Sequence, residues 1–202
     1  MYDLIGTFIF FFAVIDPIGT IPVFIAVTSR YEARVKRRIA IRAAAISAVL
    51  LTFFVVVGEL ILTALDIPLA AFEIAGGIVL FIFALSMIFG ESKPEAELKL
   101  ADSERDTAIF PLAVPSIASP GAMLAAVLLT ENNRFNLWEQ TQTTLIMYLV
   151  LLVTLALMLA ASWIHRFIGT SGASIISRVM GMILASVAVT AVLAGITEYF
   201  SL

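Results

Sequence analysis

Long apolar segments alternate with short polar connectors along the whole chain. A helix that crosses a bilayer needs about 20 mostly apolar residues. Six segments meet this length, at about 4–28, 39–64, 69–90, 107–130, 143–165 and 174–198. The pattern predicts an all-α, polytopic membrane protein with six transmembrane helices, in a single transmembrane domain that covers residues 1–202.

Composition supports this class and excludes several kinds of chemistry. Of the 202 residues, 61% are hydrophobic, which is more than a soluble domain of this size can bury. The chain has no cysteine and one histidine, His165, so we expect no disulfide framework and no metal cluster. No glycine-rich phosphate loop or basic nucleic-acid patch is present. We therefore expect no cofactor and no nucleic acid, with the lipid bilayer as the environment and a homo-oligomer left open.

Basic residues are distributed very unevenly among the connectors. Only Arg134 lies in an even-numbered connector, and the rest of the 12 Lys and Arg residues lie in or beside the first, third and fifth. These are Arg30, Arg34, Lys36, Arg37, Arg38, Arg42, Lys93, Lys99, Arg105, Arg166 and Arg178. Because cytoplasmic loops carry the basic excess, we expect a multi-pass protein of the cell membrane with both termini extracytoplasmic. The first segment has no basic stretch before it, which favours a mature span over a cleaved signal peptide.

Two of the apolar segments contain residues that interrupt a helix. The first segment holds AVIDPIGTIPVF (13–24), and the fourth holds AVPSIASPGAM (113–123). Asp16 and Ser119 each precede a proline, and such a pair favours a helix start because the side-chain oxygen caps free N–H groups. We expect both spans to be broken near the membrane midplane, at about 15–19 and 115–121. The helix-breaking prolines are Pro17, Pro22, Pro115 and Pro120.

The two breaks occupy matching positions in two halves of the chain, about 1–92 and 105–202. Each half contains three predicted spans, so the second half enters the membrane from the opposite side. The sequence therefore predicts two inverted three-helix repeats whose first helices are broken, an arrangement used by many secondary transporters.

The broken backbone supplies the chemistry of a candidate binding site. Helix N-termini expose N–H groups and partial positive charge, which suits a carboxylate. Carbonyls at the ends of the preceding half-helices suit an ammonium group, so a zwitterionic amino acid fits both. The glycines would let a substrate approach the backbone closely. The candidate substrate-binding residues are Asp16, Gly19, Thr20, Ser116, Ser119 and Gly121.

Asp16 has two interpretations that the sequence leaves open. It is either only a helix cap or also a coupling residue that binds a proton or another coupling cation such as Na⁺. Two other carboxylates, Glu59 and Glu73, lie nearer the outer ends of their predicted spans, and we expect them to be solvated at the membrane interface.

The pattern favours a secondary transporter over three alternatives. A channel or facilitator for a small polar solute could also be built from two aquaporin-like half-helices. However, the broken spans are long enough to cross fully, and the chain has no Asn-Pro-Ala motif. An intramembrane aspartyl protease needs a second carboxylate at the depth of Asp16, and none is predicted, so we expect no enzyme. A purely structural protein would not need two breaks.

The segments FFAVIDPIGTIPVFIAVT and PLAVPSIASPGAMLAAVLL, together with FEIAGGIVLFIFAL in the third span, resemble the MarC family. This family is also called the small neutral amino acid transporter (SnatA) family. The resemblance covers the whole chain, and Ser119-Pro120-Gly121 stands where Gly-Pro-Gly is often found. It implies uptake or exchange of small neutral amino acids such as glycine and alanine, coupled to an ion. With the inverted repeats, we expect alternating access around a midplane site between the two broken helices.

Overall fold

The computed structural model describes residues 3–89, 107–132 and 134–200, and this part of the chain consists of helices joined by short loops, with no strand. It contains five helices long and apolar enough to cross a membrane, or six if one bent pair counts as a single span. The elements are α1 (Leu4–Ile15), α2 (Thr20–Thr28), α3 (Ala33–Ala64), α4 (Leu69–Phe89), the irregular η2 (Ala108–Ile117), α7 (Pro120–Leu128), α8 (Leu137–Leu159) and α9 (Ala161–Phe200).

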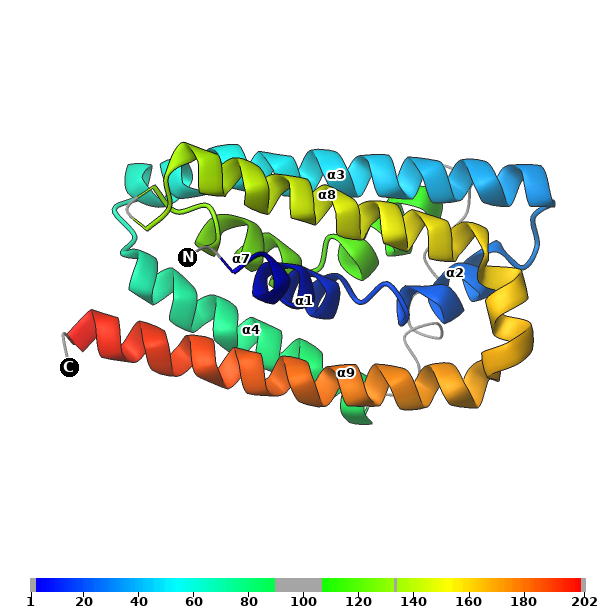
Figure 1. The fold of residues 1–202 in the computed structure, drawn as a ribbon. Coiled ribbons are helices and arrows are strands. Elements are labelled where there is room, and N and C mark those ends of the chain that lie inside the picture. The colour runs from blue at the N-terminus through cyan, green and yellow to red at the C-terminus, as the bar shows by residue number, and fades with distance from the viewer. Residues whose placement is uncertain (1–2, 90–106, 133, 201–202) are drawn as a thin grey trace.

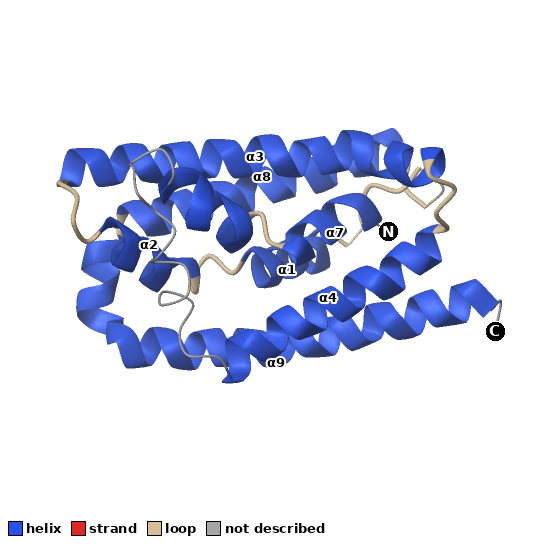
Figure 2. Cartoon of the chain, turned by 180° about the vertical axis from the view of Figure 1, so that it is seen from behind, coloured by secondary structure: helices blue, strands red, loops and turns tan. Residues whose placement is uncertain are grey.

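The helices form three layers (Figure 1). Helices α3 and α8 lie side by side on one face, and α4 and α9 pack along each other on the opposite face. The broken segments α1–α2 and η2–α7 fill the space between these two pairs, as the view from behind also shows (Figure 2). In the first span, 61% of the most apolar stretch is buried inside the protein, against 22% of the corresponding stretch of α3. The broken spans therefore form the centre of the fold.

Both termini lie at one end of the bundle, together with the α3–α4 and α7–α8 connections (Figure 1). The α2–α3 and α8–α9 connections lie at the opposite end. This distribution is the one that an even number of crossings produces. For clarity, the first of these ends is called the terminal end below.

The predicted bounds of the fifth span, 143–165, are wrong, because α8 covers Leu137–Leu159. Its first turns, which the sequence analysis assigns to a connector because they are polar, are helical. Asn136 caps the helix by accepting hydrogen bonds from the N–H groups of Trp138 and Glu139, and Glu139 bonds back to the Asn136 N–H. Threonines in these turns satisfy themselves locally, as when the Thr143 hydroxyl donates to the Glu139 carbonyl.

The prediction of a fifth connector at 165–174 is also wrong. The chain turns near Ala160, and the backbone of 165–174 is part of the continuous 40-residue helix α9. The first turns of α9 cross the end of the bundle before the rest of the helix runs along α4 (Figure 1). Similarly, α3 begins at Ala33 and not at 39, since its basic first turns are helical. The polar residues indicated the expected edge of the membrane, but the helices continue past that edge.

Candidate functional site

The first break is built around Asp16. This residue has a left-handed backbone (φ 50°, ψ 66°) and ends α1, with its N–H donating to the Phe12 carbonyl over 3.1 Å. Its carboxylate Oδ1 accepts a hydrogen bond from the Gly19 N–H at 2.9 Å, and its carbonyl accepts from the Thr20 N–H at 3.0 Å. Asp16 therefore both terminates one helix and caps the next turn. Helix α2 itself begins at Thr20, so the expected start at Asp16-Pro17 is displaced by a turn that holds Pro17 and Gly19.

Glycine at position 19 follows directly from this cap. A Cβ atom added to Gly19 would overlap Asp16 Oδ2, closer than any non-bonded contact allows. The carboxylate therefore occupies the space that a side chain at 19 would need. Pro22 lies in the first turn of α2, where its missing N–H costs little.

The second break is longer than the sequence analysis indicated. Phe110 and Val114 have extended backbones inside η2 (φ/ψ −118°/129° and −131°/127°), so the irregularity starts five residues before the expected 115–121. Each of them precedes a proline, Pro111 or Pro115, and a residue before proline is pushed out of the helical region. Proline also removes a helix donor. The spacing of four residues between the two prolines keeps regular helix from forming.

Helix α7 starts with a cap of the expected type. The Ser119 hydroxyl accepts from the Ala122 N–H at 3.1 Å, and Pro120 occupies the first helical position. Helix α7 is bent by 55° from η2. The chain therefore reaches Gly121 at the base of a helix whose axis differs from that of the segment before it.

The two breaks touch each other through side-chain hydroxyls. Ser119 Oγ donates to the carbonyl of Val14 at 2.7 Å, and the hydroxyls of Thr20 and Ser116 lie 3.4 Å apart. Asp16, Thr20, Ser116 and Ser119 are each no more than 2% exposed. Ser119 thus satisfies a carbonyl near the end of α1 and an N–H group at the start of α7, two groups that the helices leave open.

Gly121 lies at the same junction, against α4 and α1. A Cβ atom on Gly121 would overlap Leu80 Cδ1 and would lie 3.5 Å from Val14 Cβ. Absence of a side chain here lets α7 pack closely on both helices. Of the six candidate residues, the structure therefore joins Asp16 to Gly19, Thr20 to Ser116, and both Ser119 and Gly121 to Val14.

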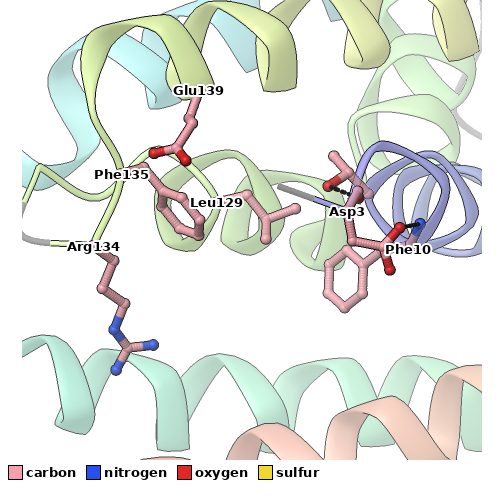
Figure 3. A pocket seen from close by; sticks show the side chains of 8 residues that line it. Asp3, Phe10, Leu129, Arg134, Phe135 and Glu139 are labelled. Carbon is pink, nitrogen blue, oxygen red and sulfur yellow. Dashed lines mark hydrogen bonds between the residues drawn. The ribbon is translucent and has the colours of Figure 1, made fainter. Parts of the chain in front are cut away.

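A pocket of about 440 Å³ lies at the terminal end, and none of the six candidate residues lines it. It is bordered by the start of α1 and by the α7–α8 connection (Figure 3). The polar part of its lining includes one basic and two acidic residues. The lining consists of Asp3, Gly6, Thr7, Phe10, Leu129, Arg134, Phe135 and Glu139. Sequence reasoning missed this pocket; the available signal was Arg134, the lone basic residue of the even-numbered connectors.

Arg134 connects this pocket to the α4–α9 pair. Its side chain extends from the α7–α8 connection toward the ribbons of α4 and α9 (Figure 3). Arg134 Nε lies 3.0 Å from a Glu131 carboxylate oxygen, and the guanidinium also pairs with Glu198 near the end of α9. Glu59 on α3 accepts the Asn132 N–H at 2.9 Å, which attaches the same connection to a third helix.

Glu73 is not solvated as the sequence analysis expects, although it lies near the terminal end of its span. It lies in the second turn of α4 and is only 7% exposed. The sequence indicates the position of Glu73 along its span but not the helices that pack against that position. Helix α4 lies against both α9 and α7.

The fold and the two joined breaks define a polytopic, all-helical membrane protein with discontinuous helices at its centre. The profile of the MarC family integral membrane proteins matches residues 1–200. A UPF0056 membrane protein of Archaeoglobus fulgidus is 33% identical, with 97% of this chain and 96% of the relative covered. YvbG of Bacillus subtilis is 31% identical (98% and 95% covered), and the inner membrane protein YhgN of Escherichia coli is 30% identical (97% and 97% covered). No solved structure matches the chain.

The chain therefore belongs to the MarC family and is an integral, multi-pass membrane protein, as the resemblance of its two proline-containing segments indicated. The names of these relatives describe membrane proteins and state no substrate.

We predict that Ser119→Ala destabilises the protein by about 1–3 kcal/mol, because the Val14 carbonyl and the Ala122 N–H both lose a buried partner. Thermal unfolding of the purified protein in detergent measures the change. Ser116→Ala is the matched control, since Ser116 makes one longer contact, and it should cost less. Equal melting of Ser119→Ala and wild type would show that this bond does not hold the breaks together.

Proposed function

We propose that this protein is a secondary transporter of small neutral amino acids of the glycine and alanine class, coupled to an ion. The observation that carries the proposal is the buried contact between the two breaks, where Ser119 Oγ meets the Val14 carbonyl. Non-helical backbone in the centre of a membrane protein is tolerated only where it is buried in protein or lines a cavity. Discontinuous helices that meet in this way are a common substrate site of transporters.

The arrangement of elements supports two inverted repeats. In chain order, each half contributes a broken span, then a helix of the α3–α8 pair, then a helix of the α4–α9 pair. The corresponding elements contact each other, since α3 packs on α8, α4 on α9, and α1–α2 on α7 and η2. The two broken spans run in opposite directions through the middle layer (Figure 1). This is the relation that a two-fold axis in the membrane plane would produce.

We place the substrate at the junction of the breaks, with its carboxylate at the N-termini of α2 and α7. Helix N-termini favour anions because of their free N–H groups and partial positive charge. Its ammonium would bind the Asp16 carboxylate and carbonyls near the end of α1. Thr20 and Ser116, which contact each other at 3.4 Å, would separate to admit the substrate, so this structure corresponds to a closed state. The 440 Å³ pocket at the terminal end is then the entrance on that side.

A small site should exclude large side chains, which generates a prediction for transport. Protein reconstituted in liposomes should exchange internal for external labelled glycine. Unlabelled glycine, alanine and serine should compete, whereas leucine should compete at least about 10-fold more weakly. Equal competition by leucine would contradict this site. A flux that rises linearly with concentration, without stimulation by internal substrate, would favour the alternative of a channel or facilitator with aquaporin-like half-helices.

Asp16 is our proposed coupling residue at this site, with H⁺ or Na⁺ as the ion. Asp16→Asn retains an oxygen that can accept from the Gly19 N–H, so the fold should survive, while the ionisable group is lost. We expect Asp16→Asn to exchange glycine but to lose accumulation driven by an imposed ion gradient. Asp16→Ala should in addition lower stability by about 1–3 kcal/mol, because a buried N–H loses its partner. Normal accumulation by Asp16→Asn would limit this residue to capping.

The basic residues lead us to propose that the terminal end is extracytoplasmic. Because the native chain has no cysteine, single cysteines report the sides of the membrane cleanly. Thr63 is exposed at the terminal end of α3, and Ser29 is exposed at the opposite end. In intact cells, a membrane-impermeant thiol reagent should label Thr63→Cys and should label Ser29→Cys only after permeabilisation. The reverse pattern would invert the topology.

A further inference from the structure

Glu73 is a buried carboxylate to which the proposed transport site gives no role. It is the only charged residue of α4 and is 7% exposed. Its Oε2 atom is inaccessible and has no hydrogen-bond partner among the described residues. A buried, ionised carboxylate is costly unless it is paired or hydrogen-bonded, so this oxygen needs an explanation.

The charges around Glu73 act in opposite directions: Arg134 attracts the ionised carboxylate, whereas Glu198 and Glu131 repel it. The groups that act on it are Arg134 and Glu131 from the α7–α8 connection and Glu198 from α9. The sequence of α7, the other helix packed on α4, contains no charged residue. Arg134 is already engaged by both Glu131 and Glu198. Two carboxylates therefore pair with the one guanidinium at the terminal end, and the third, Glu73, makes no ion pair with it.

A small cation is the simplest group that would balance this charge. Among residues 3–89, 107–132 and 134–200, no three Asp, Glu, His or Cys side chains are grouped closely enough to hold a metal ion together. The arrangement therefore fits a single positive charge held by one carboxylate, and not a multivalent metal held by several.

We propose that the Glu73 carboxylate is a binding site for one monovalent cation, H⁺ or Na⁺, at the terminal end of the bundle and separate from Asp16. An occupied site removes the repulsion that Glu131 and Glu198 exert on Glu73. Arg134 then stays with Glu131 and Glu198 and holds the α7–α8 connection against α9. Occupancy of this site thus favours the closed arrangement of the terminal end.

The test is thermal unfolding of the full chain in detergent, without substrate, so that it does not depend on the proposed transport activity. A cation that binds only the folded protein raises its melting temperature. One series lowers the pH from 8 to 5 at constant salt. A second series replaces choline chloride with NaCl at pH 8 and constant ionic strength. We expect the wild type to gain about 3 °C or more over Glu73→Gln in one series.

The series in which the wild type gains stability over Glu73→Gln identifies the cation. A response to pH indicates a proton, and a response to NaCl indicates sodium. Glu32→Gln is the matched control, because Glu32 is an exposed carboxylate whose side chain makes no capping hydrogen bond, and it should respond like the wild type. Glu73→Asp keeps the carboxylate and should keep the response. At pH 8 without sodium, Glu73→Gln should melt no lower than the wild type, since it removes a buried charge whose Oε2 atom has no hydrogen-bond partner among the described residues.

Two results would overturn the proposal. One is an identical response of wild type and Glu73→Gln in both series. The other is a Glu73→Gln protein that melts well below the wild type at pH 8 without sodium, because this would show that a protein group already compensates the charge. Failure of glycine exchange in liposomes, by contrast, would count against the transporter proposal and leave this site in place.

Discussion

The constraint on which this structure depends is that a helix end in the middle of a membrane protein has no water to satisfy its backbone. Each of the two central spans creates such ends, and the chain closes them with its own side chains. Asp16 caps the turn after α1 through the Gly19 N–H, and Ser119 caps α7. Ser119 also donates to the Val14 carbonyl, so one hydroxyl links the halves of the molecule. Because this link replaces water, the breaks must lie close together.

Close approach of the breaks in turn requires small residues. Gly121 leaves room for Leu80 and Val14, and a series of alanines in the second broken span is fully buried. These are Ala113, Ala118, Ala122, Ala125 and Ala126. Small residues let helix backbones pack closely in lipid, where no hydrophobic effect drives helices together. The middle layer therefore combines polar groups that join the spans with small groups that let them meet, and α3–α8 and α4–α9 enclose both.

Much of this architecture was accessible from the sequence because it has local causes. Apolar length indicated the spans, and the Asp-Pro and Ser-Pro pairs indicated the residues that cap. The early irregularity at Phe110 also had a local signal, since it precedes Pro111. The burial of Glu73 and its grouping with Arg134 had none, because they result from packing between segments far apart in the chain. The contacts of Thr20 with Ser116 and of Ser119 with Val14 depend on tertiary structure in the same way.

The central claim is that the two breaks meet at a site that opens for a small amino acid, and cross-linking at Thr20 and Ser116 tests it directly. Their hydroxyl oxygens lie 3.4 Å apart, which is compatible with a disulfide between cysteines at these positions. In the cysteine-free background, Thr20→Cys with Ser116→Cys should cross-link on mild oxidation, whereas neither single variant should cross-link within the chain. Glycine or alanine, but not leucine, should slow the reaction. Absence of the cross-link, or a rate that no small amino acid changes, would contradict the account.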